Sequence, residues 1–390
     1  MGSAQARAAA GQSSSALAAG LPEELDWQSL ISQVFSPAQK AVLLLTSEAT
    51  TAPAAGQPCK VVDCFRTGQD APAKEAFSPG SFGGRVGLVS QKGKKSAPNQ
   101  DCAFYLEFVD GDGSQVWLAC VMDGHGPLGH LMSRLVMQWL PILVLRDPVM
   151  AKDMGCLVPK DPQSVFDGIT AAFTKMGALM RRASAGTVEK ELSGTTCVFA
   201  LCARGLLHSA NVGDSRAVLG ALRSDPGASA FALSVDVRPL TRDHKPEDVT
   251  ERPRIEACGG FVDRQRVYTQ AWPYVGLNLS RSFGDTTVHA VGVSDTPDVA
   301  TTFLDGEGQF LLLASDGVWE FLSSEDAAES VGAHLQDADR AQPAAAPAHA
   351  SATAASAAHG AALRLVGRAT EAWRRQSDEL DDVTVVIVRI

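Results

Sequence analysis

Two long apolar runs in this chain end in the same way, with an aspartate followed by a glycine. The run VWLACVMD ends at Asp123 before Gly124, and the run FLLLASD ends at Asp316 before another glycine. A third apolar run, VTVVIVRI, follows Asp381, while Asp101 leads into the run CAFYLEFV. Runs of this length and apolarity predict buried β-strands. The chain therefore places a carboxylate at the end of each of these predicted strands.

Carboxylates at the ends of paired strands can converge on one small region, because such strands lie about 4.8 Å apart. Gathered carboxylates repel one another unless cations lie between them. Mg²⁺ and Mn²⁺ favour oxygen ligands. We therefore expect a divalent-metal site in which Asp123 bridges two ions. Gly124 can bring its backbone carbonyl close to an ion, and His125 can give a proton to a leaving group.

Each of these residues also has an ordinary explanation. An Asp-Gly pair is a common turn, and a single histidine after a strand is usually a surface residue. The combination is what favours a metal site: two apolar strands end in Asp-Gly, one of them continues into His125, and Asp101 and Asp381 stand beside further strands.

The composition divides the chain near residue 83. Residues 1–82 are rich in Ala, Ser, Gly and Pro, and we interpret them as a partly disordered N-terminal arm with an amphipathic helical segment at 21–46. Residues 83–390 predict one domain, in which the alanine-rich stretch 340–362 is a low-complexity insertion between two helices. Hairpin strands with helices grouped between them predict an antiparallel α+β architecture. Apolar residues at helical spacing predict helices near 128–139, 164–181 and 361–376.

Charge and cysteine usage exclude several classes of protein. The net charge of −10 disfavours nonspecific binding to nucleic acid. The eight cysteines show no CxxC spacing, which favours a reduced, intracellular setting. No signal peptide is evident, and the aliphatic run at 41–45 is too short to cross a bilayer. We expect a protein of the cytoplasm or the nucleus without a membrane span.

Eight sequence blocks together resemble the metal-dependent serine/threonine protein phosphatases of type 2C. In chain order they are GLVSQKGKKSAPNQD, VMDGHG, SGTTCVFAL, ANVGDSRAVL, LTRDHKPEDVTERPRIEACGG, GLNLSRSFGD, FLLLASDGVWEFLS and DDVTVVIV. The resemblance covers about residues 84–390, so 83–390 would be the catalytic domain. It implies a four-layer α-β-β-α sandwich, in which two antiparallel sheets face each other and helices flank them.

The resemblance also implies a cofactor and a set of ligands. Two Mn²⁺ or Mg²⁺ ions would lie in a cleft at one end of the sandwich, bridged by Asp123. Asp316 and Asp381 would hold one ion and the carbonyl of Gly124 the other, while Asp101 would bind directly or through water. A weaker third ion occurs in some family members, and one further residue matches its ligand position: Asp214.

The implied reaction is hydrolysis of phosphoserine and phosphothreonine in protein substrates by a metal-activated water, without a phosphoenzyme. His125 would protonate the departing oxygen. The chain departs from the family where Lys95 stands at the position of a phosphate-binding arginine and Gln100 precedes Asp101 in place of glutamate. Lysine is a point charge, so a bidentate grip on phosphate would be lost.

Two other functions remain open at this stage, and a monomer is expected for any of them. The first is a phosphatase-like scaffold that binds phosphoproteins without turnover, which the changes at Lys95 and Gln100 keep under consideration. The second is a two-metal hydrolase that acts on another phosphoester, such as a nucleotide.

Overall fold

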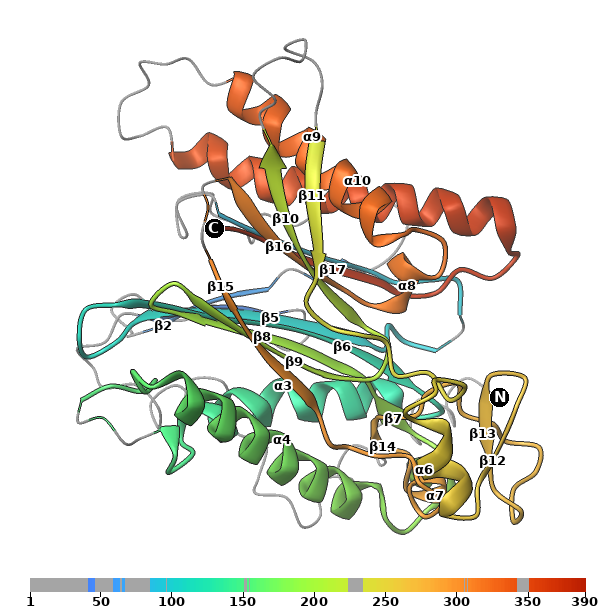
Figure 1. Ribbon diagram of the computed structural model, residues 1–390. Helices are drawn as coiled ribbons and strands as arrows, with labels where there is room; N and C mark the ends of the chain where they lie inside the picture. Colours follow the sequence, from blue (N-terminus) through green and yellow to red (C-terminus); the bar gives the residue numbers. More distant parts are fainter. Residues whose placement is uncertain are drawn as a thin grey trace, which may run out of the picture.

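The computed structural model describes residues 41–45, 59–63, 65–66, 85–95, 97–150, 153, 155–223, 234–304, 306, 308–341 and 351–390. Two sheets lie face to face, with helices on both outer faces, so the arrangement has four layers (Figure 1). The predicted α-β-β-α sandwich is confirmed. Among the described helices, none is long and apolar enough to cross a membrane.

The first sheet has nine strands. Its main path is β15 (Asp298–Phe303), β9 (Leu206–Val212), β8 (Cys197–Ala203), β6 (Gln115–His125), β5 (Asp101–Val109), β1 (Ala41–Leu45) and β2 (Cys59–Asp63). Two short strands extend it beyond the end of β6: β7 (Gly194–Thr195) and β14 (Phe283–Gly284). Neighbours are antiparallel apart from β1 and β2.

The second sheet has six strands. In spatial order they are β11 (Ser234–Pro239), β10 (Arg216–Arg223), β16 (Gln309–Ala314), β17 (Val383–Arg389), β4 (Val86–Gln91) and β3 (Phe65–Arg66). Here only the β3–β4 pair is parallel. A separate hairpin consists of β12 (Phe261–Asp263) and β13 (Arg266–Tyr268).

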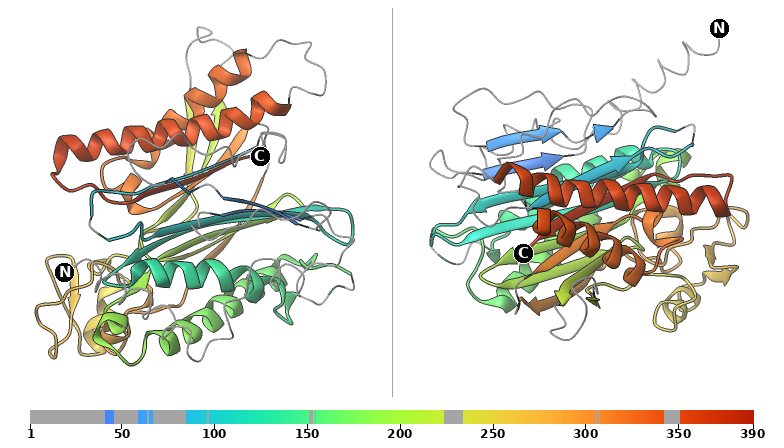
Figure 2. Two further views of the ribbon diagram at one scale, coloured as in Figure 1. Left: turned by 180° about the vertical axis from the view of Figure 1, so that it is seen from behind. Right: turned by 90° about the horizontal axis from the view of Figure 1, so that it is seen from above.

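Helices cover the two outer faces. The longer ones are α3 (Gly129–Leu145) and α4 (Pro162–Ser184) on the first sheet, and α9 (Ser324–Ala341) and α10 (Ser351–Gln376) on the second (Figures 1 and 2). The shorter ones are α5 (Val188–Glu191), α6 (Arg252–Ala257), α7 (Thr286–His289) and α8 (Asp316–Trp319). Figure 1 shows α6, α7, β12 and β13 grouped beside β7 and β14, at one end of the sandwich.

Alternation of side chains along the strands produces the layers. On β6, Leu118 and Cys120 pack into the apolar layer under α3 and α4, whereas Trp117 and Val121 pack into the layer between the sheets. A third apolar layer joins the second sheet to α9 and α10. Because successive residues of a strand point to opposite faces, an apolar run without alternation is what a strand buried on both faces requires.

The predicted helix at 21–46 is wrong over residues 41–45. These residues form β1, which pairs with β5 in the register Ala41 opposite Phe108. An apolar segment beside an exposed strand edge can satisfy its backbone donors and acceptors by joining the sheet, and this gain outweighs helical periodicity. The remainder of the predicted helix lies outside the described residues.

The predicted loop insertion at 340–362 is wrong at both of its ends, because residues 340–341 complete α9 and residues 351–362 form the first half of α10. Alanine is the strongest helix former, and its small side chain lets a helix lie close to a sheet. Ala358 and Ala361 are fully buried. A Cβ added to Gly87 of β4 would lie 2.1 Å from the carbonyl oxygen of Ala358, which shows how closely α10 packs. Residues 342–350 lie outside the described part of the chain.

Candidate functional site

The acidic residues predicted from the strand ends meet at one end of the sandwich. Asp101 and Asp123 are directly opposite each other at the ends of β5 and β6. Asp316 follows β16 and Asp381 precedes β17, and these two strands are neighbours in the second sheet. The Ser315 hydroxyl donates a hydrogen bond to Asp101 Oδ2 at 2.7 Å, so the two sheets touch at this point.

The carboxylates in this region influence one another. Burial, followed by the negative charges of Asp101, Asp316 and Asp381, raises the pKa of Asp123 well above its ordinary value. Burial and the charges of Asp214 and Asp381 likewise raise the pKa of Asp316, to about 7. Carboxylates this close cannot all carry charge at low cost without a cation among them.

Two oxygen atoms in the cluster lack hydrogen-bond partners among the described residues. Asp101 Oδ1 and Asp316 Oδ1 are both shielded from solvent, and neither has a donor within reach. Buried polar atoms nearly always have a partner, so such atoms need an explanation. Carboxylate oxygens that converge without donors fit a hard divalent cation, which takes oxygen ligands.

Gly124 is held by backbone contacts at the end of β6. Its N–H donates to the Gln100 carbonyl at 3.1 Å. A Cβ at this position would lie 2.3 Å from the carbonyl oxygen of Gly129, the first residue of α3, and 2.6 Å from that of Gln100. Close packing of backbone therefore requires glycine here, which is a reason that the sequence did not reveal. The approach of the Gly124 carbonyl to an ion stays a prediction.

Lys95 lies against the acidic cluster. Its Nζ forms an ion pair with Asp381. Burial alone would lower the pKa of Lys95, but the hydrogen bond to Asp381 and the charges of Asp381, Asp123 and Asp382 outweigh it and raise the pKa. The ammonium group therefore stays charged beside the carboxylates, as a phosphate-binding role would require.

Asp382 is a residue that the sequence analysis missed. Its carboxylate accepts hydrogen bonds from the backbone N–H of Gly93, at 2.7 Å, and of Gln100, at 2.8 Å. These bonds tie the loop that carries Lys95 to the start of β17. In the sequence, only the adjacent pair of acids in DDVTVVIV pointed to Asp382. The pair did not show which acid is a candidate metal ligand and which one holds the backbone. The contacts decide this, because they occupy Asp382 and leave Asp381 facing Lys95.

Gln100 also has a structural role. Its side-chain Nε2 donates to the carbonyl of Gly126 at 2.8 Å. A glutamate in its place could not donate this bond. The substitution thus fixes the loop that follows His125, in addition to removing a negative charge near the cluster.

Asp214 lies at the edge of the cluster. It is buried, and its carboxylate forms an ion pair with Lys245 at 2.5 Å. The charge of Asp214 is the main electrostatic cause of the raised pKa of Asp316. The structure therefore brings Asp214 next to the predicted ligands, together with a lysine that the sequence analysis did not single out.

His125 pairs with a carboxylate that the sequence analysis also missed. Its Nε2 lies 2.7 Å from Oδ2 of Asp285. Burial opposes the charged form of His125, but the charge of Asp285 and its hydrogen bond outweigh burial and raise the pKa of the imidazole. Weaker contributions come from Asp214 and Asp316, which indicates that the ring also faces the acidic cluster.

Comparison with known proteins decides the family. The family model described as "Protein phosphatase 2C" matches residues 102–359. The chain belongs to the protein phosphatase 2C family. Type 2C phosphatases are metal-dependent serine/threonine protein phosphatases, and this is the activity of the chain. The resemblance stated from the motifs is confirmed.

Individual type 2C proteins agree with this assignment. The chain is 30% identical to "Probable protein phosphatase 2C 73" of Arabidopsis thaliana, over 77% of each chain. It is 32% identical to "Probable protein phosphatase 2C 48" of Oryza sativa subsp. japonica, over 74% of this chain and 78% of the relative. The fold matches the crystal structure of a serine-threonine phosphatase 2C from Toxoplasma gondii with a TM-score of 0.60, at 20% identity, over 78% and 93% of the two chains.

This type 2C phosphatase has a cavity of about 280 Å³ on the side of His125 and Asp285. Its wall combines the turn after His125 with α5, α7 and the segment that follows β13. Apolar side chains share the wall with polar ones, and three of the lining residues besides His125 are acidic or basic: Glu191, Arg266 and Asp285. The lining includes Pro127, Glu191, Leu192, Arg266, Val275 and Leu277. A cavity next to the predicted general acid can receive a part of the substrate.

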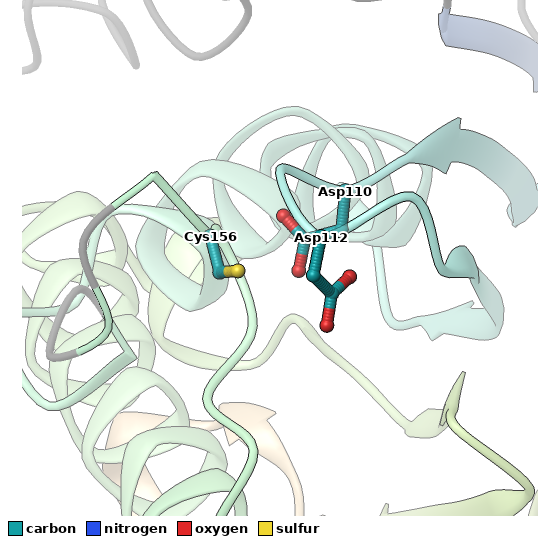
Figure 3. Close-up of side chains that lie close together, drawn as sticks. All are labelled: Asp110, Asp112 and Cys156. Carbon is teal, nitrogen blue, oxygen red and sulfur yellow. The ribbon is translucent and has the colours of Figure 1, made fainter.

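A second acidic group lies at the opposite end of the β5–β6 hairpin. Ligand atoms of Asp110, Asp112 and Cys156 lie within 4.8 Å of one another, and Figure 3 shows the three side chains converging. Asp110 already accepts hydrogen bonds from the backbone of Leu157 and from Arg204, and Asp112 pairs with Arg204 too. Because Arg204 pairs with both carboxylates and backbone N–H groups donate to Asp110, this group is explained as a structural ion pair.

Proposed function

We propose that the catalytic centre of this phosphatase holds two Mn²⁺ or Mg²⁺ ions between the ends of the two sheets. Asp123 would bridge the ions, Asp316 and Asp381 would hold one of them, the Gly124 carbonyl would hold the other, and Asp101 would bind directly or through water. The observation that carries this proposal is the convergence of these carboxylates with two shielded oxygens that lack donors.

The residues around the ions then divide the chemistry among them. Ions in such a site supply an activated water and neutralise charge on the phosphoryl oxygens. Lys95 holds the phosphate as a point charge, and His125 protonates the serine or threonine oxygen as it leaves. The reaction is a direct hydrolysis without a phosphoenzyme.

A weaker third ion uses Asp214 in the same proposal. Asp214 lies beside Asp316, and both are close to the predicted pair of ions. Lys245 neutralises Asp214, so an ion must compete with that ammonium group. This competition supports weak binding.

The substrates in this proposal are phosphorylated proteins, and the enzyme acts as a monomer in the cytoplasm or the nucleus. The cavity beside His125 supports a peptide substrate, because it offers room for residues that flank the phosphate group. Six cysteines are free, which fits a reducing compartment: Cys102, Cys120, Cys156, Cys197, Cys202 and Cys258.

The test is phosphate release from a phosphothreonine peptide, measured with Mn²⁺, with a chelator, and with the Asp123→Asn variant. We expect release with Mn²⁺, and loss of release in the other two cases. No release while Mn²⁺ is bound would favour a phosphoprotein-binding scaffold. Faster release from mononucleotides than from the peptide would favour a hydrolase of small phosphoesters.

A further inference from the structure

His125 lies between the acidic cluster and a second carboxylate, that of Asp285. We propose that Asp285 is a positioning residue, which fixes the orientation and the tautomer of His125 so that Nδ1 gives the proton to the leaving group. This inference rests on the proposed role of His125 as the general acid. Asp285 would act through His125 and not on the reacting atoms.

The contact geometry carries the first step. The 2.7 Å contact joins Asp285 Oδ2 to Nε2 of the imidazole. The Asp285 side chain is only 4% exposed, whereas that of His125 is 25% exposed. A shielded carboxylate that accepts a hydrogen bond from one ring nitrogen keeps the proton on that nitrogen. Nδ1 is then the nitrogen that can exchange a proton with the substrate.

The proton transfer balances in this arrangement. The imidazolium carries a proton on each nitrogen before the step. As the bond from phosphorus to the serine or threonine oxygen breaks, the Nδ1 proton passes to that oxygen. A neutral imidazole remains, with its Nε2–H still donating to Asp285. The carboxylate only accepts the hydrogen bond, as in other sites where an acid orients a histidine.

The backbone of Asp285 has an unusual conformation, which hydrogen bonds hold in place. Asp285 has φ +45° and ψ +43°, the left-handed conformation that costs a non-glycine residue roughly 1 kcal/mol or more. Its N–H donates to the Ser193 carbonyl at 2.9 Å, and the Ser282 hydroxyl donates to Asp285 Oδ2. A strained residue tied down from several sides is typical of functional sites.

Two glycines clear the space between the strands. His125 on β6 pairs with Gly194 on β7, and Gly194 pairs with Gly284 on β14. A Cβ on Gly194 would lie 2.0 Å from Asp285 Oδ2. Gly284 has φ +92°, a conformation that favours glycine. The ladder of three strands thus places the carboxylate against the imidazole.

Simpler roles for Asp285 do not fit its contacts. Asp285 precedes α7, but its side chain makes no capping hydrogen bond to that helix. Its Oδ2 bonds to His125 and to Ser282, unlike Asp101 Oδ1 and Asp316 Oδ1, which have no partner among the described residues. The carboxylate therefore serves the imidazole rather than the helix or an ion.

The Asp285→Asn variant tests this inference with two substrates, a phosphothreonine peptide and p-nitrophenyl phosphate. The peptide needs a proton on its leaving oxygen, whereas the nitrophenolate leaves without one. We expect kcat on the peptide to fall about 100-fold, within the range for loss of general acid catalysis. We expect kcat on the aryl phosphate to change by less than about threefold. The control is Asp263→Asn, in the exposed part of the β12–β13 hairpin, which should match the wild type on both substrates.

A double-variant cycle separates positioning from independent effects. If Asp285 acts through His125, the Asp285→Asn change should cost nothing further in the His125→Ala background. The inference would be overturned if the losses of kcat from the two single variants multiplied in the double variant. It would also be overturned if Asp285→Asn lowered kcat equally on both substrates. Should Asp285→Asn fail to fold, Ser282→Ala removes the second bond to the carboxylate and should lower peptide turnover selectively, by about threefold to tenfold. An equal loss of turnover of p-nitrophenyl phosphate in Ser282→Ala would contradict the inference.

Two readouts distinguish this inference from the proposed function. If the wild-type enzyme releases phosphate from neither substrate with Mn²⁺ or Mg²⁺, the proposed function fails. If it is active but the substrate ratio stays constant in Asp285→Asn, only the inference fails. Long-range ¹H–¹⁵N spectra of the Mg²⁺-loaded enzyme give a direct view: the neutral His125 ring should be protonated at Nε2. Protonation at Nδ1 instead would overturn the assignment.

Discussion

Asp101 and Asp123 lie directly opposite each other on neighbouring antiparallel strands, at the edge where the two sheets meet. Like charges in directly opposed positions destabilise a sheet. Asp316 and Asp381 bring further negative charge to the same place from the second sheet. The protein thus accepts a local cost in stability that the proposed cations would offset, and the first prediction follows from this.

Asp123→Asn should stabilise the chelated protein and abolish its response to Mn²⁺. Removing one charge relieves repulsion among the carboxylates, so we expect the free energy of unfolding with chelator to rise by about 1–3 kcal/mol. Mn²⁺ stabilises the wild type because it binds the folded state, and this gain should vanish in the variant. Urea unfolding with and without Mn²⁺ measures both effects. A variant that is less stable with chelator, yet is stabilised by Mn²⁺ as strongly as the wild type, would contradict the site.

Lys95→Met should change affinity for metal and for substrate in opposite directions. Lys95 pairs with Asp381 and adds positive charge beside the predicted ions. Its removal should tighten Mn²⁺ binding about threefold to tenfold, while loss of a phosphate contact raises KM for the peptide about tenfold. Calorimetry and steady-state kinetics give the two values. Lys95→Arg serves as the control, since a bidentate donor should restore a low KM. If both affinities weaken together, the lysine has a structural role instead.

Glu251→Gln should destabilise the enzyme in a manner that depends on pH. The buried carboxylate contacts Arg242, Arg254 and Arg281. Burial alone would raise the pKa of Glu251, but hydrogen bonds from Arg281 and Arg242 outweigh it and hold the pKa well below its usual range. Loss of the charge removes the carboxylate partner that three guanidinium groups share, of which that of Arg281 is buried, and this costs about 3–5 kcal/mol at pH 7.

The sign of the pH effect follows from this lowered pKa. A group whose pKa is lower in the folded state stabilises that state above its unfolded pKa, about 4.3 for glutamate, and the stabilisation is lost as the pH falls towards the folded pKa. The difference in unfolding free energy between the wild type and Glu251→Gln should therefore shrink by about 1.4 kcal/mol per unit below pH 4. Urea unfolding at pH 7 and pH 3 measures it. A difference that is constant across this range would rule out an ionised Glu251 as the cause.

Gly87→Ala and Gly367→Ala should have opposite effects on stability. The added methyl at Gly87 would lie 2.1 Å from the carbonyl oxygen of Ala358, so it should cost about 1–3 kcal/mol. Gly367 is exposed on α10 with open space around a Cβ, and alanine there should add about 0.5–1 kcal/mol. Thermal unfolding of the wild type and both variants measures these changes in stability. Tolerance of alanine at position 87 would mean that residues 351–362 do not pack on β4.

The strand-end acids could be predicted from the sequence because a strand buried on both faces has a continuous apolar sequence. The candidate metal-binding aspartates stand where these apolar runs begin or end. Convergence of Asp316 and Asp381 then follows from the antiparallel pairing of β16 with β17, whereas Asp123 reaches them through the packing of one sheet on the other. Asp285 could not be found in this way. Its role depends on its left-handed backbone and on Gly194, which lies far away in the sequence, and the sequence around Asp285 shows neither.

The errors in the fold also have physical causes. The segment 41–45 joins a sheet edge that exists only in the folded protein, so local periodicity misled the prediction. The alanine-rich residues 351–362 resemble a low-complexity loop in composition, but alanine also favours a helix that packs closely on a sheet. In both cases a tertiary contact decided between structures that the local sequence allowed.

Anomalous scattering from crystals soaked in Mn²⁺ shows whether the strand-end acids hold metal. We expect two strong peaks between the ends of the two sheets, both within ligand distance of Asp123, with Asp316 and Asp381 on one of them. Peaks only at Asp110, Asp112 and Cys156, or none near Asp123 in crystals of enzyme that is active with Mn²⁺, would contradict the proposed metal site.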